Sequence, residues 1–228
     1  MFEFLIFCLF IFAALVSVLV MVRYYRRRQT LAALALRLRM RFSARDHFKL
    51  PELLEGFHLA WFGHSCRAYN IMHGRHDDHE LLVFTWCYET GTGQQRSMHQ
   101  RNVVLWRMEE ELPVMVALRG ELFESIGRYE NFRQLKFDDA LFDHHYKLFT
   151  DQPEEAMALL DDPLRKALPA CPDVDWETGG RYLMFYTNRM VSSLQIARLI
   201  SRSSKCCRIL KESSDRKKES FGGKSRGH

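Results

Sequence analysis

The stretch ELLVFTWCYET at residues 80–90, followed by the turn GTGQQ at 91–95 and by MHQRNVVLWRM at 98–108, decides how this chain folds. Both long runs are rich in β-branched and aromatic residues, which favour strands, and the short turn between them predicts an antiparallel pair. Side chains alternate along residues 83–88 without leaving a plainly polar face. We therefore predict that this strand is central in a sheet and covered on both sides.

Other segments around this pair extend the pattern. HLAWFGHSCRAYNIMHG at 58–74 predicts two strands split near Gly63, and VDWETGGRYLMFYTNRM at 174–190 predicts a hairpin that turns at Gly179-Gly180. Residues 135–150 and the run VMVALRG after Pro113 are also expected to be extended. Neighbouring strands joined by short turns indicate an antiparallel meander.

Helices are predicted between and after these strands. Asp151 is a candidate N-cap, with Glu154 three residues later in the capping-box position. Residues 31–42 change from a helical to a strand-like period, and the sequence leaves that boundary open. Short helices are expected at 51–56 and 121–129, and a last helix begins near residue 192.

The N-terminus carries a second decisive stretch, FLIFCLFIFAALVSVLVMV at residues 4–22. Nineteen uncharged residues at ~1.5 Å rise each nearly match a ~30 Å hydrocarbon core, which predicts a transmembrane helix. A cleaved signal peptide would carry its positive charge before the apolar run, whereas here Glu3 precedes it and arginines follow it. The positive-inside rule then predicts an outer N-terminus and a cytoplasmic domain at the cell (inner) membrane.

Charge is segregated along the chain despite a net value of only +5. Residues 23–45 carry eight Arg and no acid, residues 201–228 carry nine basic residues against three acids, and residues 46–200 carry 16 basic residues against 24 acids. We expect the basic stem to lie against the anionic inner leaflet, since each basic residue near such a surface contributes ~1 kcal/mol. The basic tail has no aromatic interleaving beyond Phe221 and the body is acidic, which argues against nucleic-acid binding. The candidate lipid-facing residues are Arg23, Arg26, Arg27 and Arg28.

Together these features predict an α+β protein, in which an N-terminal transmembrane helix precedes a mostly antiparallel β-sheet with flanking helices. The expected division is a transmembrane helix at 1–22, a basic juxtamembrane stem at 23–30, a cytoplasmic α+β domain at 31–210 and a disordered basic tail at 211–228. The six scattered cysteines imply no disulfide framework and no zinc site.

The segment order resembles that of a family of uncharacterised bacterial membrane proteins that pair an N-terminal transmembrane helix with a cytoplasmic α+β domain. The resemblance spans residues 31–200 and implies a fold and a membrane location, with no activity and no catalytic residue to carry over. The segments that carry it are Tyr69-Asn70 with His73-Gly74, VFTWCYETGTGQQR with HQRNVVLW, Leu112-Pro113, FDHHYKLFTDQPEEAMALLDDPLRKAL and the late hairpin with its helix.

Three histidines near one turn, His73, His76 and His79, are the candidate metal ligands, since imidazole beside carboxylate suits zinc. Their spacing of three on a hairpin loop does not make them converge, so we expect a solvated turn. A metal-binding or pH-sensing site is the alternative hypothesis. The pair His144-His145 lies in a segment predicted to be extended, where neighbours point to opposite faces.

No other pattern points to catalysis or to a cofactor. Gly91-Thr92-Gly93 and Gly179-Gly180 lack the lysine and the strand-to-helix context of a phosphate loop, and we interpret both as turns. Cys206-Cys207 is expected near the basic tail, with neither lipidation nor redox activity favoured. The sequence therefore favours a non-catalytic interaction module at the inner leaflet with an unknown protein partner; a metal-dependent enzyme or sensor and a lipid-surface sensor are the competing hypotheses.

Overall fold

A computed structural model describes residues 2–120, 129–171 and 173–222, with side chains left out at 2, 3, 5 and 214–222. Its helices are α1 (Phe2–Arg37), α2 (Leu50–Leu53), α3 (Ala140–His145), α4 (Pro153–Leu159), α5 (Asp162–Ala167) and α6 (Ser193–Gly222), with short 3₁₀ turns η1 (His58–Trp61), η2 (Gly93–Gln95) and η4 (Leu168–Ala170). Its strands are β1 (Arg41–Arg45), β2 (His64–His76), β3 (His79–Thr90), β4 (Ser97–Leu118), β5 (Arg133–Leu135), β6 (Lys147–Thr150) and β7 (Val174–Thr187).

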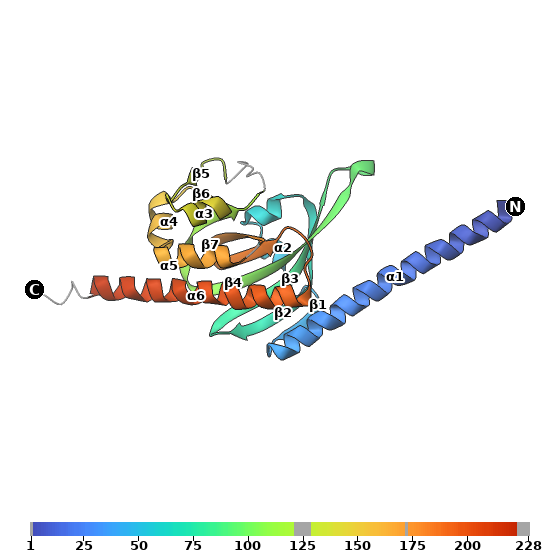
Figure 1. Ribbon diagram of the computed structural model, residues 1–228, viewed down its shortest axis with the longest axis horizontal. Helices are drawn as coiled ribbons and strands as arrows, with labels where there is room; N and C mark the ends of the chain where they lie inside the picture. Colours follow the sequence, from blue (N-terminus) through green and yellow to red (C-terminus); the bar gives the residue numbers. More distant parts are fainter. Residues whose placement is uncertain (1, 121–128, 172, 223–228) are drawn as a thin grey trace, which may run out of the picture.

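The α+β prediction is confirmed: a long apolar helix precedes a seven-stranded antiparallel sheet with helices beside it (Figure 1). Strands β1, β2, β3 and β4 follow one another across the sheet, as the predicted meander requires. Strand β4 is long enough to have two neighbours in succession on one edge, first β3 and then β6, while β7 follows its other edge. Strand β5 closes the sheet beside β6.

The sheet has an apolar cluster on each face, so the prediction that β3 is covered on both sides is correct. Val83 belongs to the cluster that α6 and the end of α1 cover, through Ile196 and Leu31 respectively. Phe84 and Trp86 belong to the opposite cluster, which lies under α2, η1 and the segment near Tyr129. Alternate side chains of β3 thus pack into two separate hydrophobic clusters, one on each face of the sheet.

Helix α1 has an apolar length that is almost fully exposed. It is the one helix in the described part of the chain that is long and apolar enough to cross a membrane. Only its C-terminal end packs on the domain, where Leu31 and Ala35 are buried. In Figure 1 the rest of α1 projects away from the sheet. The open helix-to-strand boundary is resolved by Arg39, which adopts a positive φ of 56° between α1 and β1.

Three local predictions are wrong. The expected hairpin at Gly179-Gly180 is instead one continuous strand, β7, in which Gly180 takes a φ of +54° opposite Leu112. The register shifts on either side place the extra residues in β4, so the bulges belong to β4 and the glycines lie within a paired strand. The segment 135–150 contains α3, because the Asp139 side chain caps the N–H groups of Leu141 and Phe142. Helix α4 has Gln152 at its N-cap in place of Asp151.

Two further boundaries differ from expectation. The first of the two strands predicted around Gly63 is the 3₁₀ turn η1. The chain past residue 210 is helical to Gly222 where disorder was expected: Ser213 is buried and bonded to Asp161 at 2.7 Å, and the Lys- and Glu-rich residues that follow favour helix. The helix predicted at 121–129 falls mostly outside the described residues.

Candidate interaction groove

A notch interrupts the sheet along one edge of β4. Strand β3 pairs with β4 as far as Arg107, and β6 begins to pair at Met115. Between these positions no described strand pairs with that edge, and Pro113, which has no N–H to donate, lies within the gap. The extended runs predicted before and after Pro113 form one continuous strand, β4.

The opposite edge of β4 is irregular at the same place. Its register against β7 shifts between Arg107 and Leu112 and again before Met115. Side chains replace part of the missing ladder, since Val114 N donates to Gln152 Oε1 at 3.0 Å and Thr150 Oγ1 donates to Val114 O at 2.8 Å. The backbone N–H and C=O of Val114 thus keep hydrogen-bond partners where the ladder is interrupted, and the interruption leaves space beside the strand.

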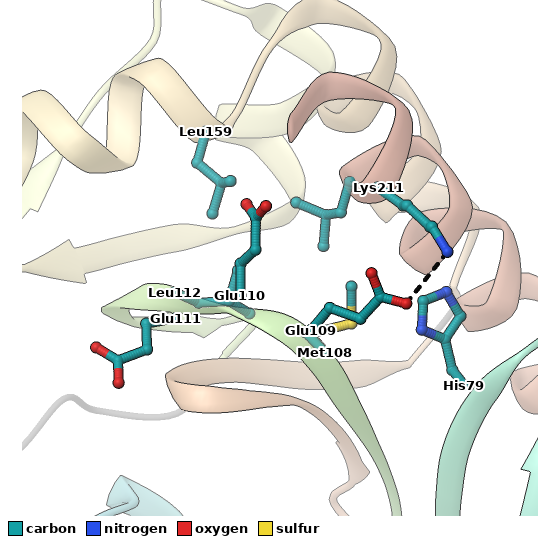
Figure 2. A pocket seen from close by; sticks show the side chains of 9 residues that line it. His79, Met108, Glu109, Glu110, Glu111, Leu112, Leu159 and Lys211 are labelled. Carbon is teal, nitrogen blue, oxygen red and sulfur yellow. Dashed lines mark hydrogen bonds and ion pairs between the residues drawn. The ribbon is translucent and has the colours of Figure 1, made fainter. Parts of the chain in front are cut away.

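That space is a groove, which we call the β4 notch. The space in it that a water-sized molecule can occupy is about 60 Å³, and it opens to solvent. Figure 2 shows residues of β4 on one side, Leu159 of α4 above them and Lys211 of α6 opposite. The lining residues are His79, Met108, Glu109, Glu110, Glu111, Leu112, Leu159, Leu210 and Lys211.

The notch combines an apolar floor with a charged rim. Met108, Leu112 and Leu210 are buried, whereas Glu109 and Glu111 are exposed. Lys211 Nζ reaches Glu109 Oε1 at 3.3 Å and bridges α6 to β4 across one end. Three successive glutamates and one lysine line the rim. That run of acids inside a β-rich segment was the sequence signal for this site that sequence reasoning missed.

The turn histidines do not converge. His76 and His79 pair across the β2–β3 turn, but His73 lies along β2 opposite Arg41 and contacts Phe48 edge-on, with ring centroids 4.9 Å apart. No group of three or more His, Cys, Asp or Glu side chains within the described residues is arranged to hold a metal ion.

The turn is also less solvated than predicted. His79 is only 6% exposed and packs edge-on against Trp106, with ring centroids 6.4 Å apart, while Asp77 bonds Ser204 of α6. Burial and, secondarily, the charge of Lys211 lower the pKa of His79, which favours the neutral imidazole. The ring of His79 lines one end of the notch.

Other candidates lie apart from the notch. His144 and His145 end α3 instead of lying in a strand. Cys206 and Cys207 are buried in α6, with Cys206 in hydrogen-bonding contact with Cys171. All six cysteines are free thiols, as the sequence predicted.

The stem arginines divide into two groups. Arg23, Arg26 and Arg28 are exposed on α1. Arg27 turns to the domain, where its guanidinium donates to Val191 O at 2.9 Å and to Asn102 Oδ1 at 3.2 Å. Arg27 thus fastens α1 to β4 and to the loop before α6, in place of the lipid contact predicted for it.

These features define a class of protein: an α+β domain on an antiparallel sheet, attached to an N-terminal apolar helix and bearing an acidic-rimmed groove. No protein-family model matches the chain, and no curated protein matches it. The family resemblance given by the sequence therefore stays a prediction.

A solved structure has a similar fold. It is the crystal structure of the mycobacterial trehalose monomycolate transport factor A, TtfA, with a TM-score of 0.60 at 12% sequence identity. The match covers 80% of this chain and 93% of that one. At this identity the likeness shows a shared fold.

Proposed function

We propose that this chain is a single-pass membrane protein whose domain serves as a non-catalytic, cytoplasmic interaction module. Its support is the exposed apolar length of α1, followed on its C-terminal side by exposed arginines, the order that the positive-inside rule associates with a cytoplasmic domain. The structure that shares this fold is named a transport factor, which is compatible with a non-catalytic role. We do not assign to this chain the transported molecule named for that protein.

The observation that carries the proposal is the β4 notch. A strand edge beside which no described strand runs between Arg107 and Met115, an apolar floor and a rim lined by glutamates together suit a peptide segment that adds beside β4. The charge of the rim selects the partner: an extended segment with Lys or Arg next to apolar residues. Rim charges of this kind accelerate association and discriminate between partners, while the apolar floor supplies most of the affinity.

The test places a photo-crosslinking amino acid at Glu111 or at Leu159 of the full chain in native membranes. Gln134, exposed in β5 away from the notch, is the matched control position. We expect one discrete adduct from both notch positions and none from the control. A Glu110→Lys/Glu111→Lys chain should lose the adduct formed from Leu159, because the reversed rim repels a basic segment. Identical products from all three positions, or an adduct indifferent to the reversed charges, would refute the proposal.

A further inference from the structure

Helix α1 and the strands of the meander run side by side, and three contacts fix their relative heights. The ring of Tyr24 lies 6.5 Å from that of Tyr69, and Arg27 bonds Asn102. Near the other end of the contact, the Met40 side chain packs against Gly74. The chain from Gly74 back to Tyr69 in β2 therefore follows α1 from its C-terminal end toward its N-terminus.

The strand register shows how far the sheet continues beyond Tyr69 in the direction of the N-terminus of α1. Tyr69 pairs with Thr85, which pairs with Asn102, so these three residues form one rung beside the Tyr24–Arg27 segment. From Thr85 the β3–β4 ladder continues as far as the pair Thr90 and Ser97. At ~3.3 Å per residue, those five positions carry the turn ~17 Å beyond the rung.

That distance exceeds what the anchor leaves free. Tyr24 lies two residues past Val22, the end of the uncharged run, so ~3 Å of helix separates the rung from the start of the apolar segment. The headgroup layer on one side of a bilayer is only ~5–8 Å thick. Figure 1 shows the β3–β4 turn projecting to the same side of the domain as the N-terminal half of α1.

The chemistry of the turn suits that position. Residues 91–99 are all exposed and contain no acid, and Met98 is 56% exposed. The nearest acid, Glu89, is itself buried and paired with Arg96 and with Arg67, the latter at 3.8 Å. Two arginines on one carboxylate leave the end of the hairpin with a positive balance, which anionic headgroups attract.

On an upright α1, ~17 Å less ~3 Å would carry these polar residues ~14 Å into the hydrocarbon, so α1 has to lean away from the turn, within the tilt range of spanning helices. We propose that α1 is tilted in this way and that the β3–β4 turn, residues 91–98, rests in the lipid headgroup layer beside it and gives the domain a second membrane contact. The inference rests on the proposed spanning of the membrane by α1. With two contacts the sheet is held at a fixed angle to the bilayer. The β4 notch then lies on the far part of the same strand, ~30 Å along β4 from the turn.

The experiment uses the full chain in nanodiscs of phosphatidylcholine and phosphatidylglycerol, with Cys8→Ala and Cys66→Ala to remove the less buried thiols. A nitroxide is attached at Gln94→Cys in the turn, or at Leu141→Cys, half-exposed in α3, as the control. Collision rates are measured with oxygen, which concentrates in the bilayer, and with a neutral nickel chelate, which stays in water. We expect nickel collisions at residue 94 to be several-fold fewer than at residue 141.

Equal nickel accessibility at residues 94 and 141 would overturn the inference. A third label at Leu15→Cys in α1 separates the two hypotheses. Frequent oxygen collisions at residue 15 together with frequent nickel collisions at residue 94 would refute only the turn contact. Frequent nickel collisions at residue 15 would refute both the membrane anchoring and the turn contact. Adding acids by Thr92→Glu/Gln95→Glu should raise nickel collisions at residue 94 in anionic discs. An unchanged rate would contradict the assignment to anionic headgroups.

Discussion

At the scale of single residues, the most unusual group is a buried carboxyl. Glu177 of β7 accepts from His58 N at 2.7 Å and from Leu59 N at 2.9 Å, and so holds η1 against the sheet. Burial raises the pKa of Glu177 to about 8. Burial, together with the charge of Arg101, lowers the pKa of His58 to about 4. Near neutral pH the carboxyl is held mostly protonated beside a neutral imidazole.

Stability should therefore depend on pH through Glu177. An unfolded Glu releases its proton near pH 4.3, whereas the folded one keeps it to about pH 8, so the folded state binds more protons between these values and loses stability as the pH rises. The slope reaches up to ~1.4 kcal/mol per pH unit. Glu177→Gln, which cannot titrate, should remove this slope in urea unfolding of the full chain in detergent micelles.

His58 acts in the opposite direction in the same experiment. Because its folded pKa is lowered, its contribution to stability is lost as the pH falls from about 6.5 towards about 4. Wild type and Glu177→Gln share this contribution, so the difference between their slopes isolates the carboxyl. Equal slopes in the two proteins would show that Glu177 is ionised in the folded state.

At the scale of elements, α6 is the helix that links β4 to the segment beside α5. Trp106 Nε1 donates to Ser203 Oγ at 2.9 Å in the core, Lys211 pairs with Glu109 at the notch, and Ser213 bonds Asp161 beside α5. The apolar residues of α6 belong to the same hydrophobic cluster as residues of β3 and β4. The position of α6, and with it one wall of the notch, depends on these contacts.

Ser203→Ala should cost ~1–3 kcal/mol of stability, because it leaves the buried Trp106 N–H without its acceptor. Ser201→Ala, exposed on the same helix, is the control and should change stability by less than about 0.5 kcal/mol. Thermal unfolding monitored by near-ultraviolet circular dichroism measures both. A Ser203→Ala protein as stable as the control would mean that this bond does not hold α6.

At the scale of the whole molecule, the anchor and the domain form one connected body. Leu31 and Ala35 enter the core, and Arg27 fastens the helix about one to two turns closer to the apolar run. A flexible tether would let the domain move freely below the bilayer. This attachment instead transmits the orientation of α1 to the sheet.

Arg27→Ala should loosen that attachment. Hydrogen bonds to a charged group contribute ~1.5–3 kcal/mol each, so losing the pair favours separated arrangements at least tenfold. Spin-label distances between residue 15 of α1 and residue 141 of α3 should broaden in nanodiscs. Arg28→Ala, exposed one residue further on, should leave the distribution as narrow as in the wild type. Equal widths in both variants would contradict a rigid attachment.

Local sequence was sufficient wherever one short-range signal acted alone. Nineteen uncharged residues specify an exposed apolar helix, and alternating β-rich runs with a short turn specify the meander from β2 to β4. Predictions failed where two signals competed. At Gly179-Gly180, a residue pair typical of turns lies inside a strand that β4 pairs along much of its length, and the long ladder outweighs the local preference.

The sequence by itself determined the fold class, the apolar anchor and the absence of a disulfide framework, because each follows from composition or from periodicity within one segment. Only the tertiary structure decided which polar groups act together. Arg27 meets Asn102, Lys211 meets Glu109 and Glu177 meets His58 through contacts between residues far apart in the chain. Such contacts depend on how the sheet curves and where α6 packs, and no local pattern encodes that.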